Sequence, residues 1–376
     1  MGIIGLLVMV MMPCVFMASE IGVNANQQVP CFFIFGDSLA DNGNNNQLLT
    51  LAKVNYKPYG IDLPNGPTGR FSNGRTTVDI IAELLGFDKH IPAFATLNNS
   101  SNLLSGANYA SGAAGILRQT GKHMGDNISL RRQVKNHRIT VSRIGDILGS
   151  KRLAKERLNK CLYWVGMGNN DYINNYFMPW IYSSGNLYNP DQYADLLIQK
   201  YHRQILELYN YGARMVTLVG LGQIGCTPNS ISVYGASEGS DCVDYMNNAV
   251  QFFNKKLITL VDQLNSYFVD AKFIYINSYG LGSGDPTIAG FKVWNVGCCV
   301  VNDIGQCEAL ESPCKNRTEY VFWDSFHPTE ASNLITANRI YKAYDPSDSY
   351  PMDLSNLVQS FGLKAEATAM AEVTSM

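Results

Sequence analysis

Four short apolar runs constrain most strongly what this chain can fold into. They cover residues 31–35, 161–165, 215–219 and 273–276, and β-branched and aromatic side chains dominate them. These side chains favour strands. Continuous apolarity over five or so residues is typical of strands that are buried on both faces, whereas a half-exposed strand alternates polar and apolar residues. The runs therefore predict the central strands of a parallel sheet.

Helical spacing of apolar residues separates these strands. The clearest helix is expected from about Asp244 to Phe268, where apolar side chains repeat along one stripe. A second is expected from Asp191 to Gly212, and a third ends at Gly86, because glycine is common just past a helix. Parallel strands need connections that cross the sheet, so the alternation predicts an α/β fold with a doubly wound parallel sheet.

The chain has 376 residues, which is long enough for two or three average domains. No internal repeat or long linker interrupts the alternation of strands and helices, so we predict a single domain over residues 26–363. The last stretch, residues 364–376, lacks apolar periodicity and is expected to be a frayed tail.

The N-terminal segment has the pattern of a secretory signal. Residues 2–18 are almost wholly apolar, and the small-residue pattern at Val23, Asn24 and Ala25 suits a signal peptidase. The alternative is a membrane anchor, but the run is shorter than the ~20 residues that a span needs. We therefore predict a signal peptide at residues 1–25 and a secreted, extracellular protein.

Charge and histidine spacing exclude several classes of function. The net charge is −2 and no Lys/Arg-rich run occurs, so a nucleic acid or an anionic membrane is not an expected partner. None of the five histidines has the spacing of a metal motif, and no glycine-rich turn matches a dinucleotide site. We predict no metal and no cofactor.

Cysteine usage points to an oxidising compartment. Of nine cysteines, eight remain after removal of the signal, and an even number suits disulfides. Two groups lie in Gly/Pro/Asn-rich segments and are expected to staple loops: Cys226 with Cys242, and a cluster of Cys298, Cys299, Cys307 and Cys314. Pairing inside the cluster stays open. Cys31 and Cys161 each begin an apolar run, which leaves a buried thiol and a bridge equally open.

Glycosylation sequons support the same route. The N-x-S/T pattern is a weak signal at any one position, but it occurs four times in this chain. The predicted glycosylation sites are Asn98, Asn99, Asn127 and Asn316.

Polar residues follow the first two predicted strands. Ser38 comes directly after the first and Asn170 after the second. Because ligands bind at the carboxyl edge of such sheets, both residues are expected at a common site. Ser38 is placed as a nucleophile at a strand-to-helix turn, and an N-cap is the alternative role for it. An ordinary turn is the alternative at Asn170.

Asp324 and His327 add a base and its partner. Three positions apart, the carboxylate can accept the Nδ1 proton and leave Nε2 free. Pro328 disfavours a helical His327 and suits the first turn of a following helix. A surface or capping histidine is the alternative. Taken together, these residues predict Ser38 as nucleophile, His327 as base and Asp324 as the group that orients the base.

A rival nucleophile is Ser237, in a G-x-S-x-G pattern at residues 235–239. That motif requires a strand before it and a helix immediately after it. The segment that follows is polar and contains Cys242, so this reading is disfavoured.

Four blocks of sequence occur in a fixed order with the predicted strands between them. They are FGDSLADNGNN at 35–45, NYASGAAG at 108–115, GNNDY at 168–172 and DSFHPTE at 324–330. Two further stretches, RFSNGRT at 70–76 and GCC at 297–299, accompany them. This set resembles the GDSL esterase/lipases of the SGNH hydrolase superfamily, and within it the large secreted plant branch. The resemblance spans nearly the whole mature chain.

The resemblance implies a flavodoxin-like, three-layer α/β/α fold whose active site opens along the sheet edge without a helical lid. It also implies an oxyanion hole formed by the backbone N–H groups of Ser38 and Gly112 and the side chain of Asn170. The family often has a second glycine where this chain has Ala113. If Ala113 were the donor, its backbone would need a conformation that tolerates a Cβ.

The function expected from residues and resemblance together is hydrolysis of a carboxylic ester through an acyl-enzyme. The substrate class stays open between lipid, phenolic and acetyl esters. Two alternatives are an acyltransferase that uses the same three residues with an alcohol acceptor, and a non-catalytic binding protein on the same scaffold.

Overall fold

The structure, a computed structural model, describes residues 27–97 and 101–362. The predicted signal peptide, the sequons at Asn98 and Asn99 and the predicted C-terminal tail lie outside the described residues. Within the described ranges, no helix has both the length and the apolarity to cross a membrane.

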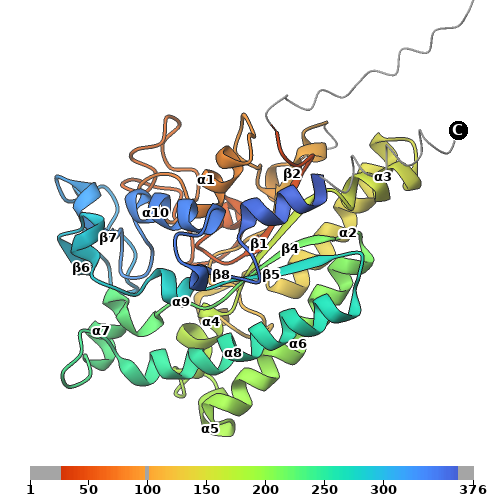
Figure 1. The fold of residues 1–376 in the computed structure, drawn as a ribbon. Coiled ribbons are helices and arrows are strands. Elements are labelled where there is room, and N and C mark those ends of the chain that lie inside the picture. The colour runs from red at the N-terminus through yellow and green to blue at the C-terminus, as the bar shows by residue number, and fades with distance from the viewer. Residues whose placement is uncertain (1–26, 98–100, 363–376) are drawn as a thin grey trace, which may run out of the picture.

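A six-stranded sheet forms the centre of the molecule (Figure 1). Its strands are β1 (Phe32–Gly36), β2 (Gly106–Asn108), β3 (Leu162–Gly166), β4 (Met215–Val219), β5 (Lys272–Ile276) and β8 (Ser349–Tyr350). They lie in the order β2-β1-β3-β4-β5-β8; the first five are parallel and β8 pairs antiparallel with β5. The order 2-1-3-4-5 is that of flavodoxin-like doubly wound sheets, which confirms the predicted fold class.

Helices connect the strands and cover both faces of the sheet (Figure 1). They are α1 (Thr77–Leu84), α2 (Leu130–Ile147), α3 (Lys151–Leu158), α4 (Asn169–Asp171), α5 (Ser184–Leu187), α6 (Pro190–Asn210), α7 (Pro228–Tyr234), α8 (Asp244–Tyr267), α9 (Ser278–Leu281) and α10 (Glu330–Tyr341). Residues 354–362 form a further helical segment. The three helices that the sequence analysis expected correspond to α8, α6 and α1.

Two buried cores lie on opposite faces of the sheet. Alternate side chains of β1 point to opposite faces, so Phe33 and Phe35 enter one core while Phe32 and Ile34 enter the other. The first core is shared with α2, α3, α6 and α8, and the second with α1, α10 and the segment at 354–358. Burial on both faces explains the continuous apolar runs of the strands.

A separate pair of parallel strands, β6 (Val293–Gly297) and β7 (Tyr320–Phe322), lies beside the main sheet. The sequence analysis did not predict it. Two disulfides, Cys298–Cys314 and Cys299–Cys307, close the segment between these strands, within the cluster that the sequence predicted.

The other two disulfides also answer the sequence predictions. Cys226–Cys242 closes the loop that precedes α8, as expected. Cys31–Cys161 joins the residues just before β1 and β3. Of the two possibilities left open for these cysteines, the structure therefore has the disulfide and not two buried thiols.

A buried ion pair fixes the start of α1. The Arg70 guanidinium donates through two nitrogens to the two oxygens of Asp79, each at 2.7 Å, and both residues are buried. Asp79 also accepts from the backbone N–H and the hydroxyl of Thr76. Burial acts to raise the pKa of Asp79, but the charge and hydrogen bonds of Arg70 outweigh it and lower that pKa from 3.8 to about 2.

Asp79→Asn is expected to lower the free energy of unfolding by about 3–5 kcal/mol, because it leaves the Arg70 charge buried without its partner. Since the folded pKa of Asp79 is below the ordinary 3.8, its contribution is present above pH ~4 and is lost as pH falls toward ~2. Urea unfolding over this pH range should therefore show the difference between variant and wild type shrinking. Glu83→Gln breaks the half-exposed pair with Arg75 and should cost less than about 1 kcal/mol.

Candidate active site

Ser38, His327 and Asp324 form a connected set of side chains at the carboxyl end of β1. His327 Nε2 lies 2.8 Å from Ser38 Oγ, although the two residues are 289 positions apart in the chain. His327 Nδ1 lies 2.8 Å from each oxygen of Asp324. Asp324 is fully buried and His327 nearly so, while Ser38 is half-buried. One ring nitrogen thus faces a carboxylate and the other a hydroxyl.

A tight turn holds Asp324 and His327 in this arrangement. The backbone N–H groups of Phe326 and His327 both donate to Asp324 Oδ1 at 2.8 Å. The following helix starts later than predicted: α10 begins at Glu330, with Thr329 as its N-cap, so Pro328 lies just before the cap. The preference of Pro328 for a non-helical His327 still applies, because it acts on the preceding residue.

The turn after β1 differs from the predicted strand-to-helix junction. No helix begins at Ser38; instead the side chain of Asp37 accepts from the Leu39 N–H at 3.0 Å, and its carbonyl accepts from Ala40 and Asp41. Burial raises the pKa of Asp37 to about 6. The Ser38 N–H donates to no acceptor among the described residues, so it is available to a ligand.

The second predicted oxyanion donor, Gly112, has a hydrogen-bond partner within the chain. The Gly112 N–H donates to Asp41 Oδ2 at 2.9 Å, so it is already occupied. The neighbouring Ala113 N–H meets no acceptor in the part of the chain that the structure describes. Ala113 has a φ of 59°, in the left-handed region, and lines the same cleft as Ser38. The available donor is therefore on Ala113, whose backbone adopts the conformation that the Cβ disfavours.

Asn170 lies on α4, which follows β3. Its Nδ2 donates to the Ala114 carbonyl at 3.1 Å, and its Oδ1 accepts from Asn174 at 2.6 Å. These two contacts fix the orientation of the amide, and its second N–H remains for a ligand. Asn170 is 8% exposed and lines the cleft.

Two buried acids that the sequence analysis did not assign hold the loop at residues 112–120. Asp41 accepts from Gly112 and from the turn at Gly43 and Asn44. Asp171 accepts from the backbone at 116–117 and from Thr120 Oγ. Burial raises the pKa of each acid to about 6. Their only sequence signal is their place inside the first and third blocks.

Two of the three predicted catalytic side chains, Ser38 and His327, line a cleft of about 990 Å³. Several exposed apolar side chains also line it, and they come from segments far apart in the chain: Leu39, Leu51, Trp180, Val233, Trp294 and Ile304. The cleft can therefore hold a large apolar group beside the Ser38 hydroxyl.

Ser237, the rival nucleophile, lies in a loop outside the cleft. Its Oγ accepts from the Asp244 N–H at 2.9 Å, in the loop closed by Cys226–Cys242, and it does not line the cleft. The G-x-S-x-G pattern therefore lacks the strand–turn–helix context that a nucleophile requires.

Two of the predicted glycosylation sites, Asn127 and Asn316, differ in exposure. Asn127 is 1% exposed, and its Nδ2 donates to the carbonyls of Ala113 and Thr120. A glycan on that nitrogen would break both bonds, so the described structure does not support the prediction for Asn127. Asn316 is exposed and caps a short helical turn through its oxygen, which leaves its nitrogen accessible.

No group of three or more His, Cys, Asp and Glu side chains that could hold a metal ion occurs among residues 27–97 and 101–362. At the Ser38 end of the cleft, the polar groups include a hydroxyl, an imidazole and amide N–H groups, which suit an acyl group with a developing negative charge.

Comparison with known proteins gives a consistent result. The sequence profile described as GDSL-like Lipase/Acylhydrolase matches residues 32–340. The chain is 53% identical over 347 residues to GDSL esterase/lipase At1g29670 of Arabidopsis thaliana, which covers 91% of this chain and 94% of the relative. It is 51% identical to At1g29660, with 90% and 93% covered, and 50% identical to At5g45670, with 87% and 92% covered; both bear the same family name and come from the same plant.

Proposed function

Because this chain belongs to the GDSL-like lipase/acylhydrolase family and is a carboxylic ester hydrolase, we propose that Ser38, His327 and Asp324 are its catalytic triad. The observation that carries the proposal is the pair of contacts made by one imidazole: Nε2 lies 2.8 Å from Ser38 Oγ, and Nδ1 lies 2.8 Å from the Asp324 carboxylate. A neutral imidazole held in this way carries its proton on Nδ1 and presents a free base to the hydroxyl.

In the first half-reaction, His327 Nε2 takes the proton of Ser38 while Oγ bonds to the ester carbonyl carbon. The carbonyl π electrons move to the oxygen and form a tetrahedral oxyanion. When this intermediate collapses, the bond to the alcohol oxygen breaks and the alcohol leaves with the proton from His327. In the second half-reaction, water bonds to the acyl carbon and gives a proton to His327. The bond from that carbon to Ser38 Oγ then breaks, Ser38 takes the proton back from His327, and the carboxylic acid is released.

We assign the oxyanion to three donors. They are the backbone N–H groups of Ser38 and Ala113 and the side-chain amide of Asn170, each of which has a hydrogen available at the cleft. Ala113 replaces the predicted Gly112 because the Gly112 N–H is bonded to Asp41. Each such donor typically contributes about 10² to 10³ in turnover.

The cleft favours an ester with a large apolar acyl group. Its volume of about 990 Å³ and lining side chains such as Trp180, Val233 and Trp294 suit an acyl chain far better than an acetyl group. We therefore favour a lipid-like ester within the substrate classes left open by the sequence.

We also propose that the protein is secreted. Four disulfides bridge all eight cysteines between residues 31 and 314, which suits an oxidising compartment. The sequon at Asn316 is accessible to the glycosylation machinery.

Labelling with a fluorophosphonate probe, followed by peptide mapping, tests the proposed nucleophile. The label is expected on Ser38 and should block hydrolysis of p-nitrophenyl esters. The unlabelled protein should cleave the dodecanoate at higher kcat/KM than the acetate. Ser237→Ala should label as the wild type does. A label on Ser237, or full hydrolysis by quantitatively labelled protein, would overturn the assignment. Product analysis with added glycerol distinguishes release of the acid from transfer to an alcohol.

A further inference from the structure

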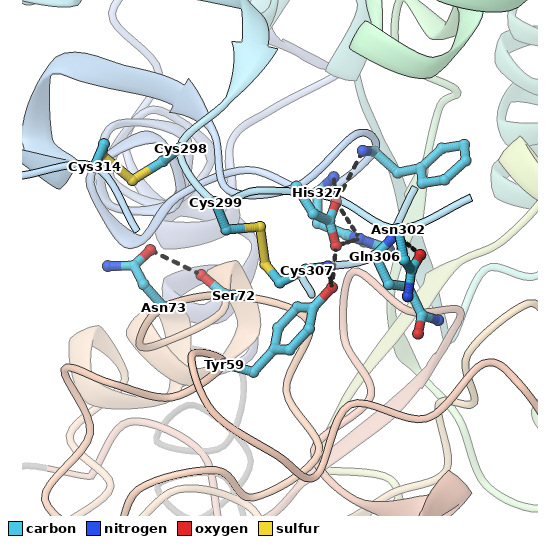
Figure 2. Close-up of a disulfide and its surroundings, with 12 residues drawn as sticks. Tyr59, Ser72, Asn73, Cys298, Cys299, Asn302, Gln306, Cys307, Cys314 and His327 are labelled. Atoms are coloured by element: carbon cyan, nitrogen blue, oxygen red, sulfur yellow. Dashed lines mark hydrogen bonds and ion pairs between the residues drawn. A yellow bond between two sulfur atoms is a disulfide. The ribbon is translucent and has the colours of Figure 1, made fainter. Parts of the chain in front are cut away.

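Tyr59 contacts the proposed triad at Asp324. Its hydroxyl donates to Asp324 Oδ2 at 2.6 Å, across 265 positions of the chain (Figure 2). The side chain is fully buried and does not line the cleft. Tyr59 therefore contacts neither the Ser38 hydroxyl nor any bound ester, and it can affect the chemistry only through Asp324.

The phenol makes a distinct contribution to the environment of this carboxylate. Asp324 Oδ1 accepts from two backbone N–H groups of its own turn. Oδ2 accepts from Tyr59 and faces His327 Nδ1. Among the described residues, Tyr59 is the one side chain besides His327 that donates to Asp324. A buried carboxylate oxygen needs such donors, and bonds to a charged acceptor are the stronger kind.

A disulfide holds the phenol in place. The Cys307 N–H donates to the Tyr59 oxygen at 3.0 Å, and Cys307 is bridged to Cys299 (Figure 2). The Cys299 N–H in turn donates to the carbonyl of Trp323, the residue before Asp324. The bridge thus connects the segment that contacts the phenol, at Cys307, to the segment that contacts the residue before the carboxylate, at Cys299.

Packing restricts the ring as well. The Tyr59 ring lies edge-on to Phe71 and Trp323, with centroids 6.3 and 6.5 Å away, and all three belong to one small core with the neighbouring disulfides. Burial and the Asp324 carboxylate together raise the pKa of Tyr59 well above 10. The hydroxyl therefore keeps its proton and remains a donor at any pH at which an esterase would work.

We propose that Tyr59 is a positioning residue for the Asp324 carboxylate and that the Cys299–Cys307 disulfide holds Tyr59 in register with it. The inference rests on the proposed triad. The connection runs from the Cys307 N–H to the Tyr59 hydroxyl, from there to Asp324, and through His327 to Ser38. The phenol fixes the carboxylate so that the Nδ1 proton stays in place while Nε2 accepts the serine proton.

Tyr59→Phe tests the positioning role, with Tyr56→Phe as a matched control. The Tyr56 hydroxyl donates to the carbonyl of the same Cys307 at 2.9 Å, and its ring packs edge-on against Tyr59, but it does not touch Asp324. Tyr59→Phe is expected to lower kcat by about 10- to 100-fold, the range for losing a hydrogen bond to a charged group, with KM unchanged. Tyr56→Phe should keep kcat within twofold.

The pH dependence of kcat/KM provides a readout that a purely structural role would not move. Without the phenol, the negative charge of Asp324 is shared with one donor fewer, so His327 holds a proton more firmly. The acid limb of the profile should therefore move to higher pH in Tyr59→Phe and stay in place in Tyr56→Phe. An unmoved limb together with wild-type kcat would overturn the positioning role.

Paired serine substitutions test the disulfide. Cys299→Ser with Cys307→Ser should lower kcat about as much as Tyr59→Phe does, and adding Tyr59→Phe should cause little further loss because both act on one contact. Cys298→Ser with Cys314→Ser removes the adjacent bridge, whose cysteines make no hydrogen bond to Tyr59 in the described part of the chain, and should keep kcat within about threefold. Additive losses would overturn the role of the disulfide. If the first pair does not fold, Tyr59→Phe decides alone.

The failure of this inference is distinguishable from failure of the proposed function. Full activity in both Tyr59→Phe and Tyr56→Phe, with Ser38→Ala inactive, would reject the positioning role and leave the triad intact. Equal loss in the two tyrosine variants would assign the effect to packing of the loop and reject it too. Full activity in Ser38→Ala would reject the triad itself.

Discussion

Ser38→Ala is expected to lower kcat for a p-nitrophenyl ester by about 10⁶-fold, the scale on which loss of a triad serine acts. The variant lacks the oxygen that attacks the carbonyl, while His327 and Asp324 keep their mutual hydrogen bonds. The remaining oxyanion donors can still orient an ester toward water, so a small residual rate above the uncatalysed reaction should persist. Initial rates at saturating ester measure the effect.

The fold should tolerate this change. Ser38 is half-buried, and its described side-chain contact is the one with His327. The thermal unfolding midpoint of Ser38→Ala should therefore match that of the wild type, and KM should change little. Ser237→Ala is the matched control and should retain wild-type kcat, because its Oγ only caps the start of α8. A Ser38→Ala protein with more than a hundredth of wild-type kcat would be incompatible with a covalent role for this serine.

The central sheet could be predicted because burial on both faces leaves a direct trace in the sequence. The runs at 31–35 and 215–219 correspond to β1 and β4 within one residue. By contrast, β2 has the sequence Gly-Ala-Asn and depends on pairing with β1 to be a strand at all. The two-residue β8 and the β6–β7 pair are likewise too short or too exposed to be recognised from sequence.

The catalytic candidates could be predicted for a related reason: each follows a strand or lies three positions from its partner. Tyr59 gives no such signal, because its role depends on a contact with Asp324 across 265 positions. Gly112 is a second case of a contact that the sequence does not show. The resemblance implied it as an oxyanion donor, but its N–H donates to Asp41, 71 positions away. Local sequence cannot show which long-range acceptor a loop amide meets.

Asp324→Asn is expected to lower kcat by about 10⁴-fold without unfolding the protein. Two backbone N–H groups donate to Oδ1 at 2.8 Å, so the amide oxygen must remain at that position. The new NH₂ group then replaces Oδ2, where it faces His327 Nδ1 and the Tyr59 hydroxyl. An NH₂ group donates to Nδ1 and fixes the imidazole proton on Nε2, so the nitrogen that faces Ser38 can no longer accept a proton.

Steady-state kinetics with a p-nitrophenyl ester measure this loss, and Asp270→Asn provides the matched control. Asp270 carries the same side chain but is exposed before β5, at the opposite end of the sheet, where it pairs with Arg214. That variant should keep wild-type kcat. Phosphonate labelling of Asp324→Asn should slow in parallel with kcat, since both reactions need the serine proton removed.

The double variant Asp324→Asn with Tyr59→Phe tests whether Tyr59 affects catalysis only through the Asp324 carboxylate. If Tyr59 works only through Asp324, its removal should cost nothing further once the carboxylate has become an amide, because the hydroxyl then faces a donor. The double variant is therefore expected to match Asp324→Asn in kcat. A second loss of 10-fold or more in the double variant would mean that Tyr59 supports Ser38 by a path that bypasses Asp324, through the packing of Phe71 against the His327 ring, whose centroids lie 4.8 Å apart.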